Sequence, residues 1–202
     1  MERKAFIIQM KNGAEALERF AGDVRDCAAR SGMDNFSVWS IEDLLLCYGE
    51  EAEGCDAAGL CGMILGGLGE GAKLLCAPGT MRLMYHDIGI VREDKSLIRH
   101  RVFCTKLKPG CEEEYKRRHD GLIATRGDAV SEGPDSNFTI WYGAGYIFGY
   151  CEKVKAFDHE PTEAEKAADI AWETRQLEIM DWLTDDVDWI TGQKHGHIRR
   201  VV

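Results

Sequence analysis

The sequence predicts an α+β protein in which a βαββαβ unit occurs twice, and three observations support this prediction. Residues 3–13 have a counterpart at 100–110, at a shift of 97. Residues 35–39 (NFSVW) have a counterpart at 137–141 (NFTIW), at a shift of 102. Strand and helix patterns follow in the same order after each copy. Because matched blocks in one order are rarely shared by chance, we predict a tandem duplication of a ferredoxin-like unit.

The duplication divides the chain into two expected repeats, residues 1–96 and residues 97–202. Each repeat has about 100 residues, which is a common domain size. The change of shift from 97 to 102 predicts a five-residue insertion in the second copy, in the loop 127–136. The alternative is that two unrelated strand–helix–strand units share common residue types.

The composition and the net charge indicate which binding partners and which cellular compartment to expect. A net charge of −10 disfavours nonspecific attraction to nucleic acid or to an anionic membrane. No apolar run reaches the length of a bilayer span, and the N-terminus enters a strand pattern without a signal peptide. The eight cysteines include no closely spaced pair. We therefore expect reduced thiols in a cytoplasmic protein, with no metal and no cofactor.

The first repeat reads as a strand, a helix, a hairpin and a closing strand. Its helix is indicated by apolar residues at three- and four-residue steps, from Leu17 to Cys27. A Glu42-Asp43 turn joins the two strands of the hairpin. The glycine-rich stretch 51–78 is expected to be a poorly regular helix or a loop. The expected bounds are a strand at 3–10, a helix at 14–31, strands at 35–41 and 44–50, and a closing strand at 81–91.

The second repeat follows the same plan with clearer signals. Gly143-Ala144-Gly145 is a strong hairpin turn signal. Thr162 can cap a long helix, with Glu165 placed for a capping box. The expected bounds are a strand at 98–107, a helix at 111–126, strands at 137–142 and 146–153, a helix at 163–183, and a short strand at 198–202.

Each predicted sheet has helices on one face, so its other face needs a partner. Two copies in one chain can supply that partner to each other. We therefore expect the two ferredoxin-like βαββαβ repeats to pack sheet-to-sheet as a pseudo-dimeric α/β barrel. Further association of such chains into a homodimer is compatible with this arrangement.

The helix at 111–126 carries the residues of chemical interest. Cys111, Tyr115 and His119 are spaced by four and share one face. The charged residues mostly lie elsewhere around the helix, so the Tyr and the His should point inward. At the shift of 97 the first repeat has Glu18 and Gly22 in their places. This difference favours a catalytic role for His119, although an inward His is often a core residue and the two helices can simply have diverged.

The second half resembles the L-rhamnose mutarotase family, small ferredoxin-like proteins that dimerise through their sheets. The first half resembles it more weakly. The matching segments are 101–103, 114–119, 137–141, 146–152 and 180–183 in the second half, and 3–9, 35–39 and 44–50 in the first.

The resemblance implies roles for particular residues. In that family the His of the motif donates a proton and the Tyr four residues earlier binds the sugar, which implies these roles for His119 and Tyr115. An aromatic residue on the second strand lines the family's pocket; here it is Phe138, which lacks a Tyr hydroxyl. The family has a Trp-Trp pair in its last helix, and this chain has Trp182-Leu183.

The implied reaction suits these residues. Interconverting pyranose anomers requires a proton at the ring oxygen and removal of one from the anomeric hydroxyl, without a metal or a redox cofactor. A His can serve as the general acid/base, because it titrates near neutral pH. Phe138 and Trp182 could stack on the apolar face of a deoxysugar. We expect a mutarotase for L-rhamnose or a related aldose, with a small-molecule sugar substrate and one site per chain.

Two other functions stay open at this stage. A sugar-binding or sensing module without turnover is suggested by Phe138, by Leu183 and by the blank first-half site. A duplicated barrel of the small-monooxygenase type would have an aromatic pocket without polar sugar ligands. His195 and His197 alone do not complete a metal site.

Overall fold

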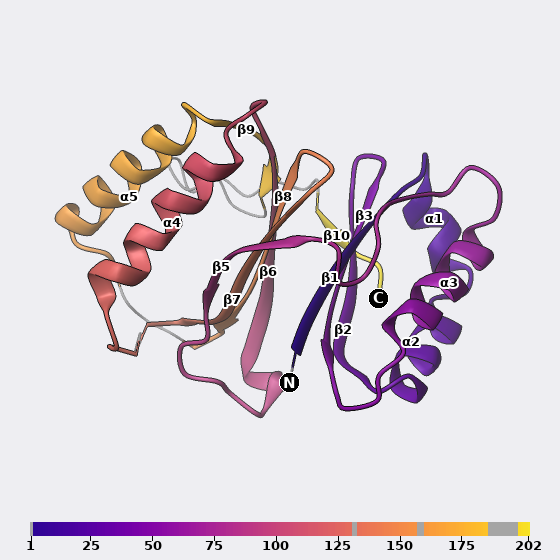
Figure 1. The fold of residues 1–202 in the computed structure, drawn as a ribbon. Coiled ribbons are helices and arrows are strands. Elements are labelled where there is room, and N and C mark those ends of the chain that lie inside the picture. The colour runs from indigo at the N-terminus through magenta and orange to yellow at the C-terminus, as the bar shows by residue number, and fades with distance from the viewer. Residues whose placement is uncertain (1, 131–132, 157–159, 186–197) are drawn as a thin grey trace. The chain divides into compact units, whose positions relative to one another are not determined.

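The computed structural model describes residues 2–130, 133–156, 160–185 and 198–202, with the backbone alone at 182–185. The chain divides into two compact units, Met1–Arg82 with His197–Val202, and Leu83–Gly196. Each unit consists of a five-stranded sheet with helices on one face (Figure 1). The chain therefore has a mixed α+β fold, as predicted.

The first unit contains three helices among its described residues. Its sheet has the strand order β10-β2-β3-β1-β4. The elements are β1 (Glu2–Gln9), α1 (Gly13–Glu18), α2 (Ala21–Arg30), β2 (Met33–Ile41), β3 (Leu44–Glu51), α3 (Ala57–Leu68), β4 (Lys73–Cys76) and β10 (Arg199–Arg200).

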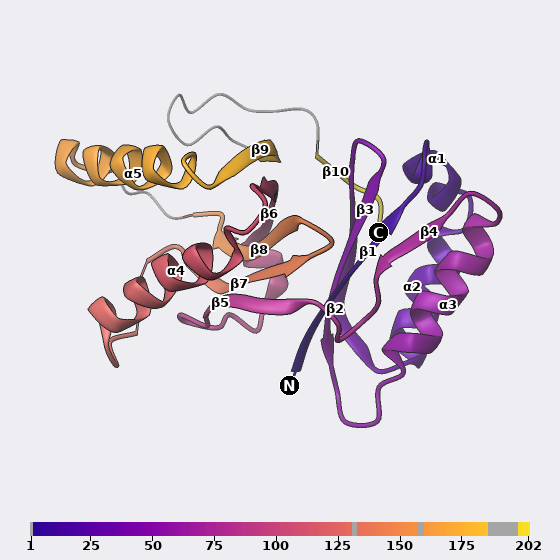
Figure 2. The ribbon, with the colours of Figure 1, turned by 45° about the horizontal axis from the view of Figure 1, so that its top comes forward.

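The second unit has the equivalent sheet, in the order β5-β7-β8-β6-β9. Helices α4 and α5 lie along one face of it (Figure 2). The elements are β5 (Arg82–Asp87), the short 3-10 helix η1 (Lys95–Leu97), β6 (Ile98–Leu107), α4 (Glu112–Arg126), β7 (Asp135–Gly143), β8 (Tyr146–Val154), α5 (Glu163–Gln176) and β9 (Met180–Asp185).

Four strands of each sheet follow the ferredoxin-like order, which places the first and third strands in the centre. The fifth strand of each sheet comes from the other half of the sequence. β5 pairs with β7, and β10 pairs antiparallel with β2. Each added strand covers a sheet edge whose backbone groups would otherwise need other partners. The sequence signal alone contained no indication of this exchange.

The compact units consequently differ from the expected ranges 1–96 and 97–202. The segment expected to close the first sheet, 81–91, contains β5, which belongs to the second sheet. The first sheet is closed by β4 instead, which pairs antiparallel with β1. The tandem duplication and the face-to-face packing of the two sheets stay predictions.

Two expected elements of the first unit were wrong in detail. The helix predicted at 14–31 is divided into α1 and α2, because Phe20 leaves the helical conformation (φ −133°, ψ 24°). The stretch 51–78 contains a regular helix, α3, whose N-cap Asp56 accepts a hydrogen bond from the Gly59 amide at 2.8 Å. Glycine at position 67 lets Phe20 approach, since a Cβ there would lie 2.5 Å from its ring. Close packing thus explains the glycine at position 67, whereas a Cβ at Gly62 or Gly66 would meet nothing within 4 Å.

The second unit confirms most of its expected elements. The hairpin turn has positive φ at Ala144 and Gly145, and the capping box of Thr162 and Glu165 is present. The helix predicted at 163–183 was too long, because α5 ends at Gln176. The chain then enters β9, which pairs with the free edge of β6. Trp182 therefore lies on a strand, and its side chain lies outside the described residues.

Among the described residues, no helix is both long and apolar enough to cross a bilayer. All eight cysteines are free thiols.

Candidate active site

Helix α4 turns its Tyr–His face into the second unit, as predicted. Tyr115 is 2% exposed and His119 is 5% exposed. Their rings stack with centroids 4.2 Å apart and an interplanar angle of 25°. Three glutamates lie in the first turn of α4, where their negative charge interacts favourably with the positive end of the helix dipole. The charged residues thus stabilise the helix, while its buried face carries the Tyr and the His.

The imidazole of His119 is held in one orientation. Its Nδ1 lies 2.9 Å from the backbone carbonyl oxygen of Tyr115. Because a carbonyl oxygen only accepts hydrogen bonds, Nδ1 must carry the hydrogen. In the neutral ring Nε2 then has the free lone pair, which makes Nε2 the basic atom.

Burial determines the protonation state of this pair. Removal from water lowers the pKa of His119 to about 4, and the bond to the Tyr115 carbonyl opposes this shift only in part. Burial, and then the nearby carboxylate of Glu173, raise the pKa of Tyr115 well above its ordinary value. At neutral pH the site therefore has a neutral imidazole beside a protonated phenol.

His119 opens onto a cavity of about 160 Å³ between α4, α5 and the sheet. This volume is below the roughly 300–1,000 Å³ of pockets for drug-sized ligands, so it suits a single small ring. The lining combines aromatic, apolar and polar side chains: Tyr85, Phe103, Tyr115, His119, Leu122, Phe138, Ile140, Trp172, Glu173, Gln176 and Met180.

Aromatic rings surround the imidazole. Tyr85 from β5 meets it edge-on with centroids 5.5 Å apart, and Trp172 from α5 does so at 5.4 Å. Phe138 from β7 meets Tyr85 at 5.4 Å. Such rings offer flat apolar surfaces and limit the access of water to His119.

The other wall of the cavity is the inward face of α5. Glu173 and Gln176 lie one turn apart on this face, and both are buried. Met180, at the start of β9, continues the same wall. Helix α5 thus adds two polar side chains to a lining that is otherwise mostly aromatic and apolar.

Helix α5 is fastened over the cavity at its C-terminal end. Arg118 donates to Glu114 (2.7 Å) on its own helix, to Glu178 (2.9 Å), and to the backbone carbonyl of Arg175. Lys108 donates to the carbonyl oxygens of Leu177 (2.8 Å) and Glu178. These cations satisfy carbonyl groups at the end of the helix, where the dipole favours positive charge.

Comparison with known proteins assigns this part of the chain. A family model described as L-rhamnose mutarotase matches residues 100–198. This match covers just under half of the 202 residues, and we call residues 100–198 the mutarotase-family segment. No curated protein and no solved structure gave a significant match.

The mutarotase-family segment contains most of the cavity, but not all of it. It includes His119, Tyr115 and Phe138, which the sequence predicted and which the structure brings together. Tyr85 precedes the segment, because β5 reaches the second sheet from the first half of the sequence. The fourth predicted site residue, Trp182, has its side chain outside the described residues.

The lining residues that sequence reasoning missed include Tyr85, Trp172, Glu173 and Gln176. The three on α5 could have been found, because Gln176 lies three or four residues after Glu173 and Trp172, which is helical spacing. A periodicity analysis of 163–183 would have placed them on one face. Tyr85 gave no such signal, because its strand pairs with a strand about fifty residues later.

The described residues of the first unit include no counterpart of this site. Glu18 and Gly22, the positions matched at the shift of 97, are both exposed, so they do not correspond in burial to Tyr115 and His119. The break after α1 changes the helical phase, and Leu17 and Ala21 are the inward residues instead. Both are apolar, so the inward positions here offer no acid or base.

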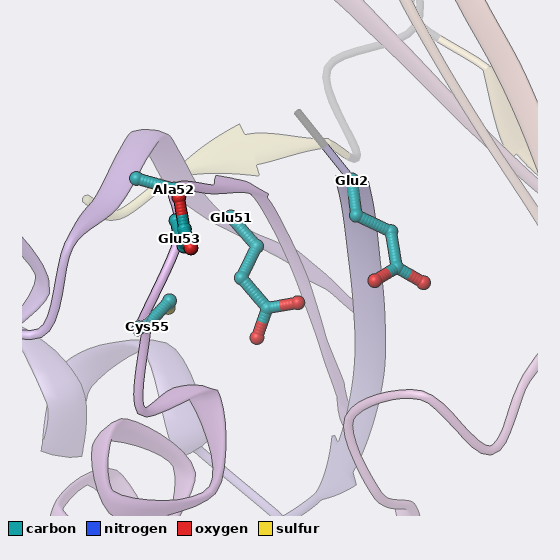
Figure 3. Close-up of a pocket in the computed structure, with 6 residues that line it drawn as sticks. Glu2, Glu51, Ala52, Glu53 and Cys55 are labelled. Carbon is teal, nitrogen blue, oxygen red and sulfur yellow. The ribbon is translucent and has the colours of Figure 1, made fainter.

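The first unit does contain an acidic hollow of about 610 Å³, near the end of β3 (Figure 3). It is lined by Glu2, Glu51 and Glu53, with Cys55 beside them. Lys4 already pairs with Glu2 at 3.0 Å and with Glu51 at 3.3 Å. No group of three His, Cys, Asp or Glu residues within the described part of the chain could hold a metal ion. His195 and His197 lie outside the described residues.

Proposed function

We propose that this protein interconverts the α and β anomers of L-rhamnose or a related aldose, with His119 as the general acid/base. One observation carries the proposal. A buried neutral imidazole, fixed through Nδ1, lines a small cavity with both polar and apolar walls, in the segment that matches the L-rhamnose mutarotase family. We infer that the cavity takes one pyranose ring.

The proposed step needs a single proton shuttle. Nε2 of His119 removes the proton from the anomeric hydroxyl, the bond between C1 and the ring oxygen breaks, and C1 becomes an aldehyde. The imidazolium gives the same proton to the ring oxygen, which is attached to the same carbon as the hydroxyl. Rotation about C1–C2 and the reverse sequence close the ring on the other face. No proton is consumed, and neither a redox cofactor nor a covalent intermediate takes part.

The low pKa of His119 fits this order of events. A neutral imidazole at neutral pH is ready to act first as a base, whereas the family resemblance implied a proton donor. Once protonated in a dry cavity it is a strong acid, which favours rapid transfer to the ring oxygen.

The lining also favours a neutral hydroxylated ring. The described residues that line the cavity include a Glu but no Lys or Arg, so an anionic sugar would lack a counter-charge. Tyr115, Glu173 and Gln176 offer hydrogen-bonding groups, while Phe138 and Trp172 offer apolar faces. This mixture disfavours the alternative of an oxygenase for an apolar compound.

The test is anomer exchange measured by NMR with L-rhamnose. His119→Ala should slow the enzyme-dependent exchange by about 10²- to 10⁴-fold, which is the usual contribution of a general acid/base. Calorimetry should show that the variant still binds the sugar. Arg117→Ala, on the exposed side of α4, should exchange like the wild type.

Two results would contradict the proposal. Equal exchange by the wild type and His119→Ala would remove the imidazole from the mechanism. Sugar binding without faster exchange by the wild type would favour a binding or sensing module instead. Calorimetry also gives the number of sites, which we expect to be one per chain, because the first unit lacks the Tyr–His pair.

A further inference from the structure

The cavity contains a buried amide without a partner. Gln176 is 2% exposed, and both Oε1 and Nε2 are buried without a hydrogen bond in the structure. The residue lines the same cavity as His119. A buried polar group without a partner costs about 1–3 kcal/mol, so native proteins rarely retain one without a reason.

The surroundings of Gln176 explain why the protein itself leaves it unsatisfied. Most of its neighbours around the cavity are aromatic or apolar, including Phe103, Ile140 and Met180. Arg118 and Lys108 bind the end of α5 through backbone carbonyls and Glu178, and so hold the helix without engaging the amide. Gln176 therefore lines the cavity from a firmly held helix, and its amide is shielded from water.

The chemistry of the amide specifies the missing partner. Oε1 needs a donor and Nε2 needs an acceptor, and the two atoms lie on one carbon. A pair of hydroxyl groups on adjacent carbons supplies both: one hydroxyl donates to Oε1 and the other accepts from Nε2. A single carbonyl or an apolar ring would leave at least one atom unsatisfied.

We propose that Gln176 binds two adjacent hydroxyl groups of the sugar, and that it thereby selects sugars with an intact vicinal diol over their deoxy analogues. This inference rests on the proposed function, because it assumes a sugar in the cavity. It assigns Gln176 a role in binding and specificity, separate from the proton transfer of His119.

The experiment compares Gln176→Met with the wild type. Methionine has a similar length and no hydrogen-bonding amide, so the free variant should unfold at the same temperature as the wild type or higher. The affinity for L-rhamnose, measured by calorimetry, should fall about 10- to 100-fold. Thr174→Ala, on the exposed side of α5, is the matched control and should bind like the wild type.

A second measurement does not depend on the variant. Wild-type protein is titrated with L-rhamnose and with its 2-deoxy, 3-deoxy and 4-deoxy analogues. Two of the analogues, each lacking one of the two adjacent hydroxyls that Gln176 binds, should bind at least 10-fold more weakly than L-rhamnose. In Gln176→Met these differences should largely disappear.

The outcomes separate this inference from the proposed function. Unchanged affinity and an unchanged deoxy profile in Gln176→Met would overturn the inference alone. A lower unfolding temperature of the free variant would also overturn it, because the amide would then have a partner within the protein. Diol-dependent binding without anomer exchange would leave the inference standing and remove the proposed function. A wild type that binds none of the four sugars would overturn both.

Discussion

Asn35 and Asn137 occupy matching positions in the two units. Both have a left-handed backbone, with φ of 48° and 52°. The amide of Asn35 donates to Glu50 at 2.9 Å, and that of Asn137 donates to Glu152 at 3.2 Å. Each Asn lies where its strand slips register against its neighbour. The same device in both units agrees with the predicted duplication.

This relationship predicts similar effects of Asn35→Ala and Asn137→Ala. Each change replaces Asn, which tolerates positive φ, by Ala, which tolerates it less well at a cost of up to about 1 kcal/mol, and removes a bond to a buried carboxylate worth about 1.5–3 kcal/mol. We expect each variant to lose about 3 kcal/mol in chemical denaturation. Asn12→Ala is the control: Asn12 also has positive φ but no capping side-chain bond, so only the backbone cost should appear. Equal losses in all three would show that the amides contribute nothing.

The two neighbouring arginines of α4 should differ sharply. Arg118 is buried and joins α4 to α5, whereas Arg117 is exposed and pairs only within its helix at 2.7 Å. Arg118→Met should cost about 2 kcal/mol and weaken sugar binding, because α5 loses its attachment. Arg117→Met should cost at most about 0.5 kcal/mol. Thermal unfolding and calorimetry measure both, and similar losses for the two variants would contradict this account of the helix pair.

His119 should make stability depend on pH. Its pKa is about 4 in the folded protein and about 6.5 in the unfolded chain. Between these values the unfolded chain binds the proton more readily, so stability falls as the pH decreases from about 6.5 to 4. The integrated effect is up to about 3 kcal/mol.

Denaturation of the wild type and of His119→Gln at pH 7.5 and 4.5 measures this term. The wild type should lose about 2–3 kcal/mol more than the variant between the two pH values. A stability difference that is the same at both pH values would show that His119 titrates as it does in water. The activity should depend on the same imidazole. It should rise with pH around the pKa of His119 in the sugar-free protein.

Two glycines of α3 should respond in opposite directions to alanine. A Cβ at Gly62 would meet nothing within 4 Å, so Gly62→Ala should stabilise the protein by about 0.5–1 kcal/mol through helix propensity. A Cβ at Gly67 would lie 2.5 Å from the Phe20 ring, so Gly67→Ala should destabilise it by about 1–3 kcal/mol. Thermal unfolding of both variants provides the check. A stabilised Gly67→Ala would mean that Phe20 is free to move aside.

The sequence by itself was sufficient for the local features of this protein. Most of the strands (β4 and β9 excepted), the inward Tyr115–His119 face and the Thr162 cap were predicted correctly, because each depends on periodicity or on residues within one helical turn. The match to the L-rhamnose mutarotase family likewise covers a continuous stretch of chain.

Only the tertiary structure decided which segments meet around the cavity. β5 brings Tyr85 to His119 by pairing with β7, and the free edge of β6 draws residues 180–185 into a strand where the local pattern favoured a helix. A sheet edge is satisfied by whichever segment reaches it, so strand partners distant in sequence leave no periodic trace. The neutral imidazole and the unsatisfied amide of Gln176 have the same origin. Both result from burial between α4, α5 and the sheet, which is a property of the packed unit and not of any one segment.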